Sequence, residues 1–114
     1  KEISMNNLEA DWVRIIKNID PILEKNINEF SQYLTEQGSE IPQKYKELIL
    51  MACSAAIRHA PGVQKRGYEA MHHGATDKEI IEALALASLA TGIGTLSDGI
   101  ISMREQFTKP SSDD

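Results

Sequence analysis

The sequence has little of several residue types, and each shortage narrows what the protein can be. Its single cysteine, Cys53, excludes an intrachain disulfide and fits a reducing compartment. Aromatic residues make up only 5% of the chain, so alanine and aliphatic side chains must fill the core, as suits closely packed helices. No run of about 18 apolar residues occurs, and we therefore expect no membrane span. No signal-peptide pattern is visible, so we predict a cytoplasmic protein.

Clustered positive charge is also missing. The formal net charge is −5, and lysine and arginine do not gather in any one segment. A protein that grips a phosphate backbone needs such a cluster, so we predict no nucleic-acid partner. The 114 residues have room for one domain with a modest core.

The patterns that are present indicate helices. Apolar residues recur at helical spacing from Leu8 to Ile19, and Asp20-Pro21 is typical of a cap followed by the first turn of a second helix. That helix ends at 37–39, and Pro42 begins a third. We predict an all-α fold, a single domain of about six helices. Its parts are an N-terminal helical pair in 1–40, a core in 41–109 and a tail in 110–114.

Two breaks organise the predicted core. Pro61 disfavours a helical conformation at Ala60, so the third helix should end before it and a fourth should open at Pro61 and close near Gly74. Thr76 and Glu79 have the spacing of a capping box, in which each side chain binds the other's backbone N–H. They should begin a fifth helix, and glycines at 92 and 94 should separate it from a last helix that ends near residue 107.

The segment from Pro42 to Gly99 resembles a known family. It contains Lys46-Glu47-Leu48-Ile49, then Ala70-x-x-x-Gly74-Ala75-Thr76, then Glu79-Ile80-x-Glu82-Ala83. This frame is similar to that of the carboxymuconolactone decarboxylase and alkylhydroperoxidase D-like family. The resemblance implies an all-α scaffold and a homo-oligomer, either a trimer or a hexamer built from trimers. It covers about half of the chain, and the first 40 residues add nothing to it.

The same frame shows that the family's best-known chemistry is missing. The family carries Cys-x-x-Cys-x-x-x-His, and in this register the first cysteine falls on His59, the second on Gly62 and the histidine on Arg66. Thiol peroxidases need an attacking and a resolving thiol, and this chain offers only Cys53, which the helical pattern places among buried residues. The family's lactone decarboxylases include some with glutamate at the position of Gly62 and histidine at that of Arg66. Neither residue is present, so that mechanism does not transfer.

The residues left for chemistry are Glu47, His59 and Arg66. If the family geometry holds, the helices carrying Glu47 and Arg66 are antiparallel neighbours and these side chains converge. The positive end of a helix favours a neutral imidazole at His59, which could act with Glu47 as a catalytic acid–base pair while Arg66 binds an anionic substrate. The alternative is a purely structural Glu47–Arg66 ion pair with His59 in a loop. We predict that the pair forms within one subunit, close to His59, and that Arg66→Ala costs about 3–5 kcal/mol if the pair is buried.

The two adjacent histidines, His72 and His73, do not indicate a metal site. Neighbouring residues on a helix point about 100° apart, so the two rings cannot easily bind one ion. A helix C-terminus favours cationic side chains, which explains them more simply. We therefore predict no metal and no other cofactor.

Two functions remain. The first is an enzyme that acts on a small organic acid by acid–base chemistry, such as a decarboxylase, another lyase or an isomerase. The second is a non-catalytic oligomeric member of the family that binds a partner or supports an assembly. A thiol peroxidase is a remote third. An enclosed polar pocket that reaches His59 would favour the first function, and a helix surface rich in isoleucine and leucine would favour the second.

Overall fold

The computed structural model describes residues 5–38 and 40–110, and for 5–10 the backbone alone. Ser39, the tail after Pro110 and the side chain of Leu8 therefore lie outside the description. The described residues are helical apart from short turns and contain no strand, so the predicted all-α class is confirmed. No helix in the described ranges is both long and apolar enough to cross a membrane. The chain divides into two compact units, Lys1–Ser39 and Glu40–Asp114.

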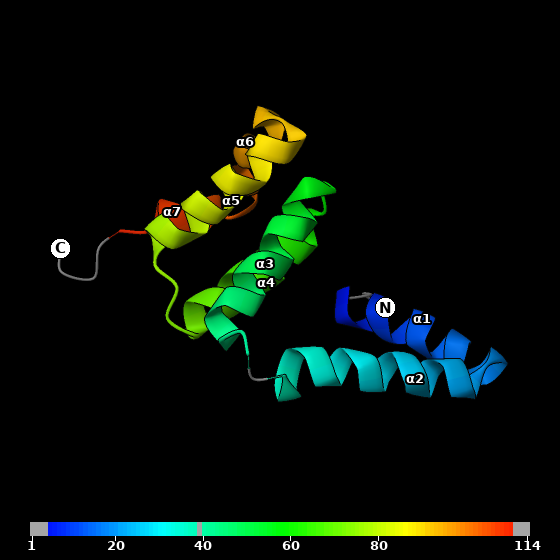
Figure 1. The fold of residues 1–114 in the computed structure, drawn as a ribbon. Helices are drawn as coiled ribbons and strands as arrows, with labels where there is room; N and C mark the ends of the chain where they lie inside the picture. Colours follow the sequence, from blue (N-terminus) through cyan, green and yellow to red (C-terminus); the bar gives the residue numbers. More distant parts are fainter. Residues whose placement is uncertain (1–4, 39, 111–114) are drawn as a thin grey trace. The chain divides into compact units, whose positions relative to one another are not determined.

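The first unit holds helices α1 (Met5–Ile19) and α2 (Pro21–Gln32), and a π-helical turn, η1 (Tyr33–Gln37), continues α2 (Figure 1). The predicted cap between them is present, since Asp20 Oδ1 accepts a hydrogen bond from the Leu23 amide at 3.0 Å and Pro21 stands in the first turn. No residue of α2 is buried, and the side chains of Ile22 and Phe30 are 72% and 68% exposed. This unit therefore leaves much of its apolar stripe uncovered.

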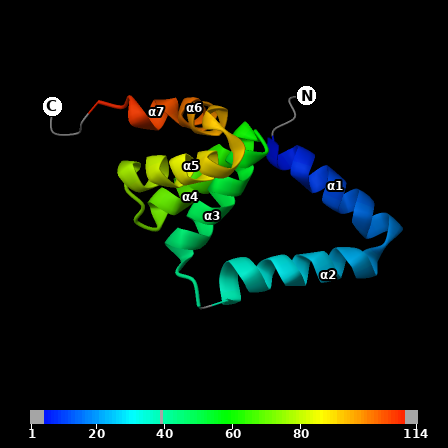
Figure 2. The ribbon, with the colours of Figure 1, turned by 45° about the horizontal axis from the view of Figure 1, so that its top comes forward.

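The second unit contains the predicted core. Its helices are α3 (Gln43–Ala56), α4 (Ala60–His72), α5 (Asp77–Thr91), α6 (Ile93–Ser102) and α7 (Arg104–Phe107). Figures 1 and 2 show α3 and α4 side by side, joined by a short turn, with α5 running along them. The expected last helix is divided by a turn at Met103, which gives seven α-helices in the described chain instead of six.

The capping box is confirmed at the start of α5. The Glu79 amide donates to the Thr76 hydroxyl at 3.1 Å, and the Thr76 amide donates to Glu79 Oε1 at 2.9 Å. Lys44 of α3 reaches the same carboxylate, with its Nζ 3.1 Å from Glu79 Oε2. A cap that was predicted from local spacing thus also ties the beginning of α5 to α3.

The core lies where α3, α4 and α5 meet and consists of small and flexible side chains. Its buried members are Met51, Ala55, Val63, Ala70, Ala75, Ile80, Leu84 and Met103. The interpretation of Cys53 was wrong, because this residue is exposed. From Leu48 to Ala56 the third helix is apolar on nearly every side, so its pattern alone does not show which side faces α4.

Candidate functional site

The turn between α3 and α4 sets the geometry of the candidate site. Helix α3 ends at Ala56, and Arg58 adopts a left-handed conformation with φ of 60°, which reverses the chain. His59 then caps α4, since its Nδ1 accepts a hydrogen bond from the Gly62 amide at 3.0 Å. The fourth helix starts at Ala60, one residue before the predicted start at Pro61. The two helices consequently run antiparallel as a hairpin.

Glu47 and Arg66 face each other across this hairpin. Arg66 Nη1 lies 3.1 Å from Glu47 Oε1, and Gln43, one turn earlier on α3, donates from Nε2 to Glu47 Oε2 at 2.9 Å. The Glu47 side chain is only 5% exposed, whereas that of Arg66 is 29% exposed. The predicted ion pair within one subunit is therefore confirmed.

The arrangement leaves part of the Arg66 side chain exposed. Both carboxylate oxygens of Glu47 are engaged, Oε1 by Nη1 of Arg66 and Oε2 by Gln43. Among the described residues, the remaining N–H groups of Arg66 have no hydrogen-bond partner. A guanidinium offers five donors in a rigid fork that matches a carboxylate, so a part-exposed and anchored arginine is suited to bind one.

His59 lies farther along the same helix face. It precedes Arg66 by seven residues, which is two helical turns and roughly 10 Å along the axis. The structure therefore pairs Glu47 with Arg66 and gives His59 a separate contact, the cap on Gly62. With Nδ1 accepting, the neutral ring carries its proton on Nε2, which is then a hydrogen-bond donor.

Gly62, between His59 and Arg66 on this face, has no room for a side chain. A Cβ atom placed there would lie 2.6 Å from Ser54 Oγ and 2.7 Å from His59 Nδ1. Gly62 stands where the family motif has its second cysteine, and Ser54 of α3 fills the space that a side chain would need there. The spacing of the sequence did not reveal this, because Ser54 and Gly62 belong to different helices.

The adjacent histidines lie at the C-terminal end of α4, where His73 is the C-cap residue. Their rings meet edge to face with centroids 5.5 Å apart, and His73 Nδ1 is 2.9 Å from the carbonyl oxygen of Glu69. Within the described residues, no group of three histidine, cysteine, aspartate or glutamate side chains has the geometry to hold a metal ion.

The comparisons with known proteins agree with the frame read from the sequence. The model of the carboxymuconolactone decarboxylase family matches residues 21–101, more than two thirds of the chain. The match begins at the first residue of α2 and ends within α6, so the expectation that the first 40 residues add nothing to the resemblance was wrong for residues 21–40. No curated protein and no solved structure gives a significant match.

Proposed function

Because the chain belongs to the carboxymuconolactone decarboxylase family, we propose that it acts on a small organic acid without using a thiol, and that Arg66 binds the acid's carboxylate. The observation that carries this proposal is the anchoring of Arg66 by Glu47, which is itself held by Gln43. An arginine fixed in this way loses little further freedom when it binds, so its unused donors form a preorganised carboxylate receptor.

In this proposal Glu47 has a positioning role and His59 has the chemical one. Glu47 is almost fully buried and uses both oxygens, so it holds Arg66 in place instead of accepting a proton from the substrate. His59 presents Nε2–H about two turns away, where it would donate a hydrogen bond to a substrate oxygen that gains negative charge. The acid therefore needs a carboxylate and a second oxygen several bonds distant. Decarboxylation next to a carbonyl develops charge on such an oxygen and needs no base; elimination and isomerisation do so once water has taken the α-proton.

The test combines binding and turnover. We expect saturable binding of small dicarboxylates and keto acids, measured by calorimetry with succinate, adipate and levulinate as probes. Arg66→Gln should weaken binding roughly tenfold or more, and Arg66→Lys should weaken it less. Carboxylate binding that is unchanged in Arg66→Gln would overturn the proposal.

The role of His59 needs a variant that preserves the cap. Asparagine is a good N-cap residue, so His59→Asn should keep α4 stable while removing the Nε2–H donor. We expect this variant to bind the acid normally and to lose turnover, followed by release of carbon dioxide or by absorbance of an unsaturated acid. If the wild type binds acids and turns over none of them, the non-catalytic function replaces the enzymatic one.

The same samples test the absence of thiol chemistry. With an exposed Cys53 but no second thiol in the sequence, we expect no hydroperoxide turnover with a dithiol reductant above that of Cys53→Ser. Robust turnover that disappears in Cys53→Ser would contradict this. We also propose a cytoplasmic location, since an exposed free thiol persists most readily in a reducing compartment.

The second candidate, a non-catalytic oligomeric member, is favoured by the exposed apolar face of α3 and α5. Tyr45 and Ile49 of α3 and Leu86 of α5 are each about half exposed or more. They surround an open groove of about 470 Å³ whose floor contains Ala83 and Ala87. We propose that this α3–α5 face joins copies of the chain into a trimer or a hexamer. Assembly and acid binding use different faces of α3, so both can hold for one protein.

A further inference from the structure

The seam along which α3 and α4 face each other contains a polar group that the proposed function does not use, the hydroxyl of Ser54. On α3, Ser54 follows Glu47 by seven residues, and on α4 the same interval separates His59 from Arg66. Seven residues are about two helical turns, so each pair lies on one face of its helix. Because the helices are antiparallel and the Glu47–Arg66 pair closes one end of the seam, Ser54 lies toward its other end.

Two contacts place Ser54 beside the beginning of α4. Its carbonyl oxygen accepts a hydrogen bond from the His59 amide at 2.9 Å. Its Oγ lies 2.6 Å from the point that a Cβ atom at Gly62 would occupy. Gly62 stands about one helical turn from His59 and one from Arg66. The hydroxyl of Ser54 therefore lies at the level on this face where a side chain of residue 62 would begin.

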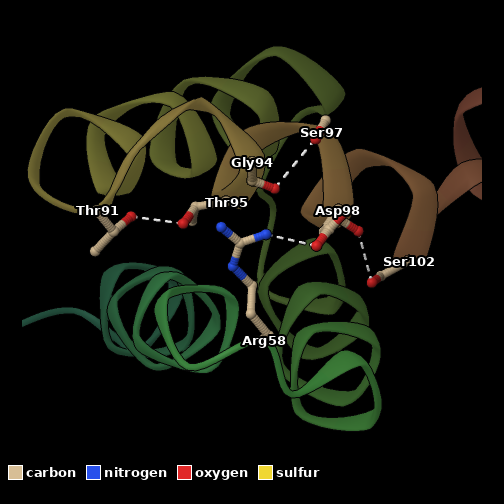
Figure 3. Close-up of polar contacts among 7 residues, drawn as sticks. All are labelled: Arg58, Thr91, Gly94, Thr95, Ser97, Asp98 and Ser102. Atoms are coloured by element: carbon tan, nitrogen blue, oxygen red, sulfur yellow. Dashed lines mark hydrogen bonds and ion pairs between the residues drawn. The ribbon is translucent and has the colours of Figure 1, made fainter.

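The turn that joins α3 to α4 sets the spacing between Ser54 and His59. Its left-handed residue, Arg58, has a φ of 60° and reverses the chain between them. Figure 3 shows the Arg58 guanidinium reaching from this turn to α6, where Nη1 lies 2.5 Å from Oδ2 of Asp98. The Arg58 side chain thus contacts α6 and leaves the seam to Ser54 and His59.

The Ser54 hydroxyl is unpaired and open to solvent. It makes no hydrogen bond to any described residue. In the described part of the chain, every buried side-chain nitrogen or oxygen has a hydrogen-bond partner, so an unpaired oxygen of the partly buried Ser54 must reach water. His59 does not activate this hydroxyl, because Nδ1 of the ring already accepts from the Gly62 amide. The hydroxyl is consequently suited to bind a ligand group and not to act as a nucleophile.

We propose that Ser54 determines specificity by binding a hydroxyl group on the carbon chain of the acid. This inference rests on the proposed function, in which Arg66 binds the carboxylate and His59 a second oxygen. The Ser54 hydroxyl lies between their levels on α4 and can both donate and accept, as a substrate hydroxyl does. An acid with a plain methylene chain would cover Ser54 and leave its hydroxyl without a partner, which weakens binding. The preferred substrates are therefore hydroxy acids whose hydroxyl lies between the carboxylate and the second oxygen.

The test compares glutarate with 3-hydroxyglutarate, which differ only by a hydroxyl group on the central carbon. Both acids carry a carboxylate at each end, so either end can bind Arg66 and the hydroxyl stays in the middle. Calorimetry with the full chain should give roughly threefold to tenfold tighter binding of 3-hydroxyglutarate. Equal affinities, or tighter binding of glutarate, would overturn the inference.

Ser54→Ala should remove this preference without unfolding the protein, because the lost hydroxyl has no partner in the protein and alanine favours helices. We expect an unchanged melting temperature, glutarate binding at least as tight as in the wild type, and no advantage for 3-hydroxyglutarate. Ser97→Ala is the matched control on α6, since the Ser97 hydroxyl donates to the Gly94 carbonyl oxygen of its own helix (Figure 3). A preference that survives Ser54→Ala, or that Ser97→Ala also removes, would overturn the role of Ser54.

Arg66→Gln separates this inference from the proposed function. If glutarate binds the wild type and binds Arg66→Gln more weakly, but the added hydroxyl brings no gain, the acid site stands and the role of Ser54 is refuted. If the preference depends on Ser54 while Arg66→Gln binds both acids as tightly as the wild type, the role of Arg66 is refuted instead. A wild type that binds neither acid would refute both.

Discussion

At the scale of single residues, Glu47 shows how a buried charge can be identified from sequence. The predicted turn between the third and fourth helices brought Glu47 opposite Arg66 on the next helix, and the structure confirms that contact. Gln43 was not predicted, although it stands at i−4 from Glu47, where two helical side chains meet. Arg58 and Asp98 were missed because they are forty residues apart and no local pattern connects them.

The first residue-scale prediction concerns Arg66→Ala. The sequence led to an expected loss of about 3–5 kcal/mol for a buried pair, but Gln43 still binds Glu47 after the substitution and water reaches the Arg66 side chain. We now expect a loss of about 1–3 kcal/mol, the typical cost of leaving one buried polar contact unmade. Urea denaturation measures the loss.

A double-mutant cycle that combines Arg66→Ala with Gln43→Ala should give a coupling energy, because the two residues share one carboxylate. Additive losses would show that Gln43 does not support Glu47.

A second prediction concerns pH and Glu79. The Thr76 amide and the Lys44 ammonium group lower the pKa of Glu79, while Glu79 raises the pKa of Lys44. Because the folded-state pKa of Glu79 lies below its unfolded value, its contribution to stability is complete above the unfolded pKa and is lost as the pH falls through the folded one. Lys44 behaves oppositely, and its contribution is lost only as the pH rises through its raised pKa.

Glu79→Gln tests this directly, since the amide oxygen can still accept from the Thr76 amide but carries no charge. We expect the free energy of unfolding of the variant to fall less steeply than that of the wild type between neutral and acidic pH. Urea denaturation at a series of pH values measures the two slopes. Equal slopes would mean that Glu79 titrates alike in both states.

At the scale of elements, the sequence predicted best where the signal is local. The caps at Asp20 and Thr76 and the break between α3 and α4 were all found from neighbouring residues. The predictions failed where packing between elements decides. Cys53 was placed in the core because α3 is apolar nearly all round, and a helical period cannot choose among several apolar sides. The turn at Met103 has no proline or glycine to signal it.

Gly62 gives an element-scale prediction. Glycine to alanine in a helix usually stabilises by about 0.5–1 kcal/mol, but here the new Cβ would meet Ser54 Oγ and His59 Nδ1 at less than contact distance. We expect Gly62→Ala to destabilise the protein by about 1–3 kcal/mol, because the methyl group must push α3 and the cap of α4 apart. Thermal or urea denaturation gives the value.

Gly94→Ala is the matched control near the start of α6. Its Cβ would approach only the guanidinium of Arg58, the free end of a flexible side chain that can move away. We expect little change or a small gain in stability. A loss as large as that of Gly62→Ala would show that overpacking at Ser54 is not the cause.

At the scale of the whole molecule, the α3–α5 face decides whether the chain works alone. Ile57 after α3, Leu89 of α5 and Ile93 of α6 are further exposed apolar side chains of the same unit, with 75%, 84% and 74% exposed. A stable interface buries roughly 800 Å² per partner, and a face with bulky rims and an alanine floor can complement itself in a second copy. Family membership does not identify the interface, so the choice of this face rests on the exposed side chains that surround its groove.

The last prediction therefore concerns self-association. We expect sedimentation at micromolar concentration to give a trimer or a hexamer, and Ile49→Asp to shift it toward the monomer, because a charge in the centre of the interface would be buried without a partner. Tyr68→Asp in α4, where the side chain is 43% exposed and lies outside this face, is the matched control and should leave the assembly intact. Cys53 is exposed one turn after Ile49 on α3 and reports on the same face. Its alkylation should be slower in the wild type than in Ile49→Asp, since the assembly covers the thiol. The interface would be refuted if the wild type were monomeric and its Cys53 reacted as fast as that of Ile49→Asp. The α3–α5 face would then not bind a second copy of the chain.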